Sequence, residues 1–262
     1  MSNDAGLRIE FPQDHPGVML LTLDRPPVNA MSLALFTKLR DTMLKAADDQ
    51  KVRCIVLTAS GKLFCAGADV KELSERTTQS QLARSVVSRA CFDAIRSCPV
   101  PVIAAVNGAA LGAGLVIASC CDMLVASKDA TFSLPEVNVG VMGGTRHAAR
   151  VLPDKLMRYL ALTGRKIGAD ALMRHGGANE VVAPEKVLDT AFEIADEIAR
   201  KGPNTVRLLK ESINLTEDMP ITEGYRVEQL FTTLASSMDE SKEASLAFVE
   251  KRDPKWVSDL KD

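Results

Sequence analysis

Short, uninterrupted apolar runs alternate with amphipathic segments along the first half of the chain. Residues 17–23 (GVMLLTL) and 53–59 (RCIVLTA) are rich in aliphatic and β-branched residues, which predicts two strands. The segment between them, residues 32–50, predicts a helix that Ser32 caps at its start. Its apolar positions recur at helical spacing: Leu35, Leu39, Met43 and Ala46.

The same alternation continues beyond this first unit. A helical stretch over residues 74–97 is followed by strand-like runs at 100–106, 121–127 and 130–136. Strand and helix signals that recur in this way predict an α/β layered core.

From about residue 154 the pattern becomes helical. Gly164, Gly176 and Gly202 stand at the ends of the periodic segments, where glycine commonly ends a helix. The chain then continues as amphipathic helices, so we expect a core domain over residues 1–202 and a helical C-terminal region over residues 203–262. The helices of that region could cover the core or pack against another subunit.

Composition and charge narrow the functional classes. Hydrophobic residues make up 46% of the chain and charged residues 25%, which is typical of a globular protein. The formal net charge of −2 provides no general attraction to a phosphate backbone, so we expect no nucleic-acid partner. No apolar run reaches the ~20 residues that span a bilayer. The first residues also lack the pattern of a signal peptide, so we expect a cytoplasmic protein with no membrane partner.

The cysteines and histidines form no recognisable disulfide framework or metal site. Cys54, Cys120 and Cys121 lie in or beside apolar segments, and no C-x-x-C pattern occurs, so we expect buried, reduced thiols. The three histidines are scattered along the chain: His15, His147 and His175. Their separation argues against a metal ion.

A turn rich in glycine and alanine, residues 106–114 (VNGAALGAG), joins the strand at 100–106 to an apolar helix. Its glycines match neither the G-x-G-x-x-G pattern of dinucleotide binding nor a P-loop. A helix start offers unpaired N–H groups, and small residues let a polarised oxygen approach them. Small residues also permit tight helix–strand packing, so this turn alone leaves both interpretations open.

A second turn of small residues follows the strand at 53–59. In GKLFCAGADVKEL, residues 61–73, Ala66, Gly67 and Ala68 precede a helix that opens at Asp69. Two separate backbone turns can supply the two N–H donors of an oxyanion hole. Such a hole stabilises the enolate that forms when the α-carbon of a thioester gains or loses a proton.

With these two turns in place, the chain resembles the crotonase, or enoyl-CoA hydratase/isomerase, superfamily from about residue 17 to residue 256. The resemblance rests on segments in a specific order: LDRPPVNAMS, GKLFCAGADVKEL, IAAVNGAALGAGLVIASCCDMLVAS, ATFSLPEVNVG, LTGRKIGADAL and AFVEKRDPKW. It implies a spiral of repeated strand–strand–helix turns with a C-terminal helical region for trimerisation, and hence a homotrimer or a dimer of trimers. It also implies an acyl-CoA thioester as substrate, with no separate cofactor and no metal.

The resemblance assigns roles to individual positions. The backbone N–H groups of Ala68 and Ala113 match the two oxyanion donors, although the family usually has glycine at the second. Glu136 matches the second of two glutamates in family hydratases, and Val116 occupies the position of the first. Further positions match residues around the coenzyme A: Val28, Lys62, Ala66 and Lys71 along the channel, and Phe248 and Lys251 in the tail of the same or a neighbouring subunit.

The resemblance leaves Glu136 as the single candidate acid/base. Because some members of the family add water with only this second glutamate, we expect reversible hydration of a 2-enoyl-CoA. Positional isomerisation of an enoyl-CoA double bond needs only one base and is the main alternative. A third interpretation is that the protein binds acyl-CoA without catalysis, and Val116 favours this interpretation slightly. Arg146 and His147 follow a shortened loop and could replace the missing acid, although an exposed helix start is the simpler interpretation.

Other reactive residues receive structural interpretations. No motif places a histidine beside Cys65, which disfavours a nucleophilic cysteine. Asp69 is expected to cap a helix, and Asp122 to have a structural role. Met142 and Met157 are interpreted as packing residues.

Overall fold

A six-stranded sheet forms the centre of the core. The computed structural model describes residues 5–74, 77–258 and 260. In spatial order the strands are β1 (Leu7–Glu10), β2 (Val18–Leu23), β3 (Cys54–Ala59), β4 (Val102–Val106), β6 (Met123–Ser127) and β9 (Glu180–Val182). β1 pairs with β2 in antiparallel register, and every other neighbouring pair in this sheet is parallel. Parallel neighbours require crossover connections, which the helices of the core supply.

A second sheet has three short strands, in the order β5 (Ala110–Leu111), β7 (Thr131–Ser133) and β8 (Lys166–Gly168). β5 follows β4 in the chain, and β7 follows β6. The chain thus adds a strand to the large sheet and then one to the small sheet before it continues into helix. This order confirms the predicted α/β architecture of strand–strand–helix units.

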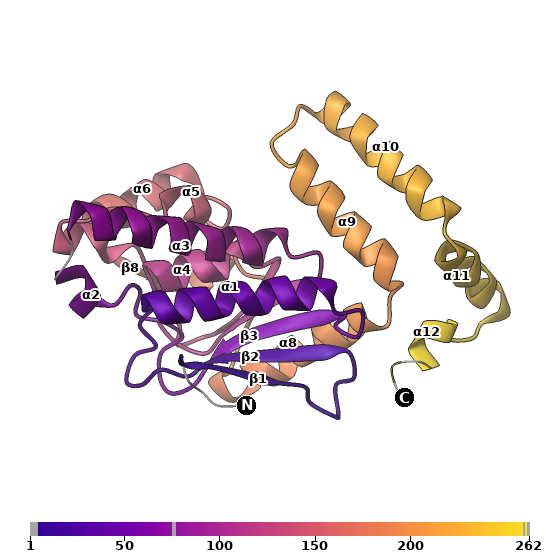
Figure 1. Cartoon of the computed structure of the whole chain (residues 1–262), viewed down its shortest axis with the longest axis horizontal. Coiled ribbons are helices and arrows are strands. Elements are labelled where there is room, and N and C mark those ends of the chain that lie inside the picture. Colours follow the sequence, from indigo (N-terminus) through magenta and orange to yellow (C-terminus); the bar gives the residue numbers. More distant parts are fainter. Residues whose placement is uncertain (1–4, 75–76, 259, 261–262) are drawn as a thin grey trace.

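Helices cover both faces of the large sheet (Figure 1). The core helices are α1 (Leu33–Asp48), α2 (Val70–Ser74), α3 (Thr78–Ser97), α4 (Ala113–Cys120), α5 (Thr145–Ala148), α6 (Asp154–Thr163), α7 (Ala169–Arg174) and α8 (Val187–Ala199), with 3-10 helices η1 (Pro135–Val139) and η2 (Pro184–Lys186). In β3, Ile55 and Leu57 pack on the side of α1, α3 and α4, whereas Cys54 and Val56 pack on the side of α8. Burial on both faces explains why the strand sequences are apolar throughout instead of alternating.

Helix α1 forms as its sequence predicts. Ser32 Oγ accepts a hydrogen bond from the Leu35 amide at 3.2 Å, which confirms the N-cap. The four apolar positions of the predicted stripe, Leu35, Leu39, Met43 and Ala46, have no exposed surface. Full burial of a leucine or methionine side chain stabilises the fold by ~1.5–3 kcal/mol. This helix is therefore held by its buried face.

The predicted strand over residues 130–136 is wrong in its second half. β7 ends at Ser133, and Pro135 begins the 3-10 helix η1. Proline has no N–H to donate to a strand ladder, but its fixed φ suits the first turn of a helix. Glu136 therefore lies on a helical turn and not at the end of a strand.

The sulfur-containing residues follow their predictions with one exception. All six cysteines are free and buried, as expected for reduced thiols. Met157 packs against the core, which confirms its predicted role. The prediction for Met142 is wrong, because 93% of its side-chain surface is exposed. Met142 lies in the loop before α5, at the edge of the cavity described below.

The C-terminal region extends away from the core as an arm of helices (Figure 1). The arm consists of α9 (Pro203–Thr216), α10 (Ile221–Ser237), α11 (Asp239–Glu250) and α12 (Lys255–Ser258). Many of its apolar side chains are exposed: Leu209, Ile213, Leu215, Ile221, Tyr225, Leu230, Leu234, Phe248 and Val249. Within the described residues, no helix combines the length and apolar character needed to cross a membrane.

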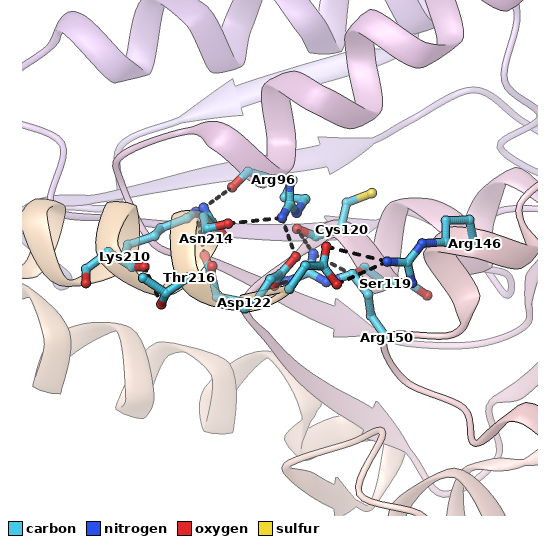
Figure 2. Close-up of polar contacts among 12 residues, drawn as sticks. Arg96, Ser119, Cys120, Asp122, Arg146, Arg150, Lys210, Asn214 and Thr216 are labelled. Carbon is cyan, nitrogen blue, oxygen red and sulfur yellow. Dashed lines mark hydrogen bonds and ion pairs between the residues drawn. The ribbon is translucent and has the colours of Figure 1, made fainter. Parts of the chain in front are cut away.

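Polar contacts attach α9 to the core (Figure 2). Lys210 Nζ lies 2.6 Å from Asp122 Oδ2, and the lysine side chain is only 7% exposed. The same carboxylate oxygen accepts the backbone amide of Val102 at 2.7 Å, so Asp122 joins strand β4 to the arm. Arg96, near the end of α3, pairs with Glu217 just beyond α9. These contacts confirm the structural role predicted for Asp122.

Candidate active site

Two turns that follow strands of the core meet at one cavity. The turn after β3 contributes Gly67 and Ala68, and the turn between β5 and α4 contributes Gly112 and Ala113. The cavity has a volume of about 300 Å³, and Glu136 also lines it. In parallel α/β sheets, ligands bind beside the carboxyl ends of the strands, which is where these turns lie.

The backbones of the two turns are joined directly. The Leu111 amide donates to the Cys65 carbonyl at 2.9 Å, and the Cys65 amide donates to the Ala109 carbonyl at 3.0 Å. A methyl group on Gly114 would come within 2.5 Å of the Cys65 carbonyl oxygen. Part of the glycine-rich turn is therefore stripped of side chains because the other turn packs against it. The packing interpretation therefore applies to Gly114, while the donor interpretation stays a prediction.

The amides of Ala68 and Ala113 have no hydrogen-bond partner among the described residues. Ala113 is the first residue of α4, so no carbonyl of its own helix can accept from it. Positive φ values in the two turns fall on Gly67 (99°) and Gly112 (52°), which tolerate them. Ala113 itself is helical, so its methyl group adds no backbone strain. The two predicted donors line the same cavity with their N–H groups unpaired.

Glu136 lies beside the second turn. A methyl group on Gly112 would come within 2.6 Å of Glu136 Oε1, so glycine at this position leaves room for the carboxyl group. Glu136 Oε2 is buried and has no hydrogen-bond partner in the described part of the chain. Burial disfavours the charged form and raises the pKa of Glu136 above its ordinary value. A half-buried carboxyl group with a raised pKa is suited to proton transfer.

Val116 forms an apolar wall of the cavity where the resemblance would place a second glutamate. The side chain is 2% exposed and lies on α4, one turn after Ala113. A methyl group on Gly144 would come within 2.5 Å of Val116 Cγ2, so the loop before α5 packs closely on it. Among the described residues that line the cavity, Glu136 is the one with a carboxyl group, and position 116 has none.

The chain matches the enoyl-CoA hydratase/isomerase family over residues 13–259. It belongs to this family. It is 38% identical over 242 residues to the (7aS)-7a-methyl-1,5-dioxo-2,3,5,6,7,7a-hexahydro-1H-indene-carboxyl-CoA hydrolase of Mycobacterium tuberculosis, across 90% of this chain and 96% of that protein. It is 33% identical over 249 residues to the carnitinyl-CoA dehydratase of Escherichia coli K12, across 91% of this chain and 94% of that protein.

Solved structures of the family share the fold of this chain. The enoyl-CoA hydratase of Bacillus anthracis superposes with a TM-score of 0.90 at 30% identity, across 95% of this chain and 98% of that chain. The enoyl-CoA hydratase of Mycobacterium smegmatis superposes with a TM-score of 0.91 at 31% identity, across 96% and 99%. These similarities confirm the crotonase-type fold predicted from the sequence.

The residues expected along the coenzyme A channel fall into two groups. In the core, Ala66 lines the cavity, and its amide donates to the Val28 carbonyl at 3.0 Å. Lys62 and Lys71 lie on either side of this turn with exposed side chains. Two exposed lysines thus flank the turn that contains Ala66 and Ala68.

Phe248 and Lys251 are not brought to the cavity within one chain. Both lie at the end of α11. Figure 1 shows α11 at the opposite end of the molecule from α2, the helix that follows the first cavity turn. The Phe248 side chain is 86% exposed. Of the two places that the family resemblance allows for them, the same subunit is therefore disfavoured, and a neighbouring subunit stays a prediction.

Cys65 and Asp69 have the structural roles that the sequence predicts. Cys65 is fully buried, and burial raises the pKa of its thiol to about 12, so it carries no thiolate near neutral pH. Asp69 Oδ1 accepts the Lys71 amide at 3.0 Å, and Asp69 Oδ2 pairs with Arg25 at 2.6 Å. Asp69 is thus a structural cap, as predicted.

Arg146 and His147 do not replace the missing acid. Both lie on the short helix α5, and neither is among the described residues that line the cavity of Glu136. Arg146 is largely exposed and pairs with Asp218 at 3.2 Å. The simpler interpretation, a helix start facing away from the site, applies to Arg146, while His147 is half-buried.

The sequence interpretation missed one wall of the cavity. Helix α3 contributes Gln81, Arg84, Ser88 and Phe92 to the lining. Their spacing of three, four and four residues places them on one stripe of the helix. This spacing was a usable signal, but a polar stripe on a helix is commonly solvent-exposed, and only the tertiary structure brings it to the site.

Proposed function

We propose that this protein catalyses the reversible hydration of a 2-enoyl-CoA. One observation carries the proposal: two unpartnered amides, of Ala68 and Ala113, line the same cavity as the half-buried carboxyl group of Glu136. The amides bind the thioester oxygen, and Glu136 transfers the proton. Proton transfer beside a polarised carbonyl requires no redox cofactor and no metal, so the substrate's own coenzyme A suffices.

In the direction of hydration, Glu136 removes a proton from water while the water oxygen bonds to C3 of the substrate. The electron pair of the C2–C3 double bond moves toward the thioester, and the enolate oxygen accepts hydrogen bonds from the Ala68 and Ala113 amides. Glu136 then returns the proton to C2, which gives a 3-hydroxyacyl-CoA. Each donor of an oxyanion hole contributes ~10²–10³-fold in kcat, and a general acid/base contributes ~10²–10⁴-fold.

The names of the relatives support water as a reactant. The Escherichia coli relative is named a dehydratase and the Mycobacterium tuberculosis relative a hydrolase, and both reaction classes gain or lose water. Since Glu136 carries the one carboxyl group among the described residues that line the cavity, it takes both proton-transfer roles in turn.

Double-bond isomerisation is the second candidate, and Val116 favours it. An isomerase needs a base to move a proton from C2 to C4 of a 3-enoyl-CoA, without a second group to position water. The apolar Val116 side chain occupies the position where a second carboxylate would hold that water. Glu136 and the two amides would serve this reaction equally well.

For the coenzyme A moiety, we infer contacts with Val28, Lys62, Ala66 and Lys71. Ala66 and Val28 line or support the turn beside the first oxyanion donor, and the exposed ammonium groups of the two lysines suit nucleotide phosphates as mobile point charges. Because the tail residues lie far from the cavity of their own chain, we place them at the coenzyme A of a neighbouring subunit. These tail residues are Phe248 and Lys251.

A homotrimer, or a dimer of trimers, fits this arrangement. The arm exposes many large apolar residues, such as Ile221 (90%) and Leu230 (70%), and exposed apolar surface of this kind commonly marks a subunit interface. Six unbonded, buried cysteines support a reducing compartment, so we place the enzyme in the cytoplasm. Light scattering of the purified protein would test the assembly, and a monomer at micromolar concentration would contradict it.

The deciding experiment compares crotonyl-CoA, a 2-enoyl-CoA, with 3-butenoyl-CoA as substrates of the purified protein. We expect loss of the conjugated enoyl thioester absorbance with crotonyl-CoA, and the loss should depend on Glu136. The matched variants are Glu136→Gln and the surface substitution Glu185→Gln. Faster conversion of 3-butenoyl-CoA to crotonyl-CoA would establish the isomerase instead. Binding of either ester without Glu136-dependent turnover would overturn an enzymatic role.

A further inference from the structure

The α3 wall of the cavity is polar, unlike the wall formed by Val116. Gln81, Arg84 and Ser88 lie on one stripe of α3, and all three line the cavity that holds Glu136. The proposed hydration uses none of these side chains. A cavity that accepted only a plain alkyl chain would have no need of them.

Three contacts fix the Arg84 side chain in place. Its guanidinium pairs with Glu72, its Nη2 donates to the Met31 carbonyl at 2.8 Å, and it lies 5.5 Å from the ring centre of Phe36. Glu72 also accepts the Leu33 amide at 3.1 Å. The Arg84 side chain is only 11% exposed. These contacts hold the guanidinium plane rigid at the cavity wall.

The guanidinium retains donors beyond those contacts. A guanidinium has more N–H groups than the two contacts, with Glu72 and Met31, can occupy. Among the described residues, Arg84 has no other hydrogen-bond acceptor. An apolar acyl chain packed against Arg84 would displace the water that hydrogen-bonds to these N–H groups. It would provide no acceptor in exchange, so its binding there is unfavourable.

Gln81 and Ser88 supply acceptors on the same stripe. Gln81 Oε1 is buried and has no partner in the described part of the chain, while Gln81 Nε2 reaches only Ser85 Oγ, at 3.4 Å. The Ser88 hydroxyl donates to the carbonyl of Ser85 at 3.3 Å, which leaves its oxygen able to accept. The stripe therefore offers both a donor and acceptors.

The charge balance of this wall selects among oxygen-containing groups. Glu72 neutralises Arg84, and Glu136 is a further acidic group of the same cavity. A substrate carboxylate would meet little net positive charge here, whereas a keto or hydroxyl oxygen needs only hydrogen bonds. We propose that the α3 stripe selects acyl-CoA substrates with an uncharged keto or hydroxyl group on the acyl chain, with Arg84 as the specificity-determining donor. This inference rests on the proposed function, because it assumes that the cavity holds the acyl group.

The test compares kcat/KM for three 2-enoyl-CoA substrates of equal chain length: 2-hexenoyl-CoA, 5-oxo-2-hexenoyl-CoA and 2-hexenedioyl-CoA. We expect wild type to prefer the oxo substrate to the alkyl substrate at least ~10-fold, because a site built to hydrogen-bond discriminates strongly against analogues that lack the group. Arg84→Met should remove this preference. Arg89→Met, on the exposed side of the same helix, should retain it.

Arg84→Met leaves Glu72 without its partner and could fail to fold. Arg84→Lys is therefore a second variant, because it keeps a positive charge beside Glu72. We expect this variant to melt near the wild-type temperature and to keep part of the preference, since lysine lacks the planar fork. An equal preference in wild type and Arg84→Met would overturn the inference. So would a stronger preference for the dicarboxylic ester than for the oxo ester.

The two proposals can fail separately. Glu136-dependent turnover of all substrates without any Arg84-dependent preference would retain the proposed hydration and reject the specificity inference. If no substrate is hydrated, calorimetry with 5-oxohexanoyl-CoA and hexanoyl-CoA decides the inference. Tighter binding of the oxo ester that Arg84→Met abolishes would support it, and equal binding would reject it.

Discussion

The core and the arm of this protein treat their apolar residues in opposite ways. In the core, Leu35 and Leu39 are fully buried, whereas in the arm Ile221 and Leu230 are 90% and 70% exposed. The core buries its apolar residues within one chain, and it contains Glu136 and the two turns with the unpaired amides of Ala68 and Ala113. None of the described residues of the arm lines the cavity, and many of its apolar side chains are exposed instead.

The attachment of the arm to the core is also of a different kind. Lys210 pairs with Asp122, and Arg207 donates to the carbonyls of Ala47 and Asp49 at the end of α1. Directional polar contacts of this type fix the direction in which α9 leaves the core, while contributing less apolar burial than the core helices. The comparison teaches that the cavity lining and the exposed apolar side chains of the arm lie in different parts of this chain.

The largest effect on the core should come from Glu136→Gln. We expect kcat/KM to fall ~10²–10⁴-fold, because the amide cannot transfer the proton. Thermal unfolding should occur at an equal or higher temperature, since the buried carboxyl group of Glu136 is costly to ionise. Steady-state kinetics and calorimetric melting measure the two quantities. A parallel loss of activity and stability would indicate a structural role instead.

Lys210→Met tests whether the attachment of the arm matters mainly for stability. Removal of one partner of a buried ion pair costs ~3–5 kcal/mol, and we expect about 3 kcal/mol because Asp122 keeps some contact with water. The exposed pair of Lys186 with Asp189 is the control, and Lys186→Met should cost less than ~1 kcal/mol. Urea unfolding curves give both values. Equal costs for the two variants would contradict the proposed anchoring.

Gly112→Ala perturbs the site through the backbone. Its methyl group would meet Glu136 Oε1 at 2.6 Å, and alanine rarely adopts a φ of 52°. We expect kcat/KM to fall ~10–100-fold as the carboxyl group is displaced. Gly168→Ala is the matched control, because Gly168 has an ordinary φ and no atom within 4 Å of the added methyl group. A wild-type rate for Gly112→Ala would contradict the assignment of the Glu136 carboxyl group beside Gly112 as the acid/base.

The smallest effect is expected in the pH dependence. Burial raises the pKa of Glu136 in the folded protein, so the acidic limb of kcat/KM for hydration should lie above the ordinary value of ~4.3 for glutamate. The ionised carboxyl group destabilises the folded state above its folded pKa, and this cost vanishes below the unfolded pKa. Glu136→Gln should therefore gain stability over wild type at pH 8 but not at pH 4. A difference that is larger at pH 4 would contradict this assignment.

The local parts of the fold could be predicted because their signals lie close together in the sequence. The stripe of α1 and its Ser32 cap, and the apolar runs of β2 and β3, follow directly from helical and strand periodicity. Ala68, Ala113 and Glu136 could also be identified as candidate site residues, because each lies in a motif that resembles one of the family. Prediction failed at Met142, where hydrophobic character suggested packing but the loop leaves the side chain in solvent.

The helical stripe of α1, the apolar strands and the burial of the cysteines could be predicted from the sequence by itself, because each signal depends on residues a few positions apart. The chemical groups of the site were assigned by the family resemblance, which depends on segments in a specific order along the chain. The tertiary structure alone decided that Gln81, Arg84 and Ser88 face the cavity, and that Phe248 lies far from the cavity of its own chain. It also decided that Lys210 meets Asp122 across the chain. The physical reason is that the crossover connections decide which helix faces pack together. The periodicity of one helix shows which residues share a face, but not which element that face contacts.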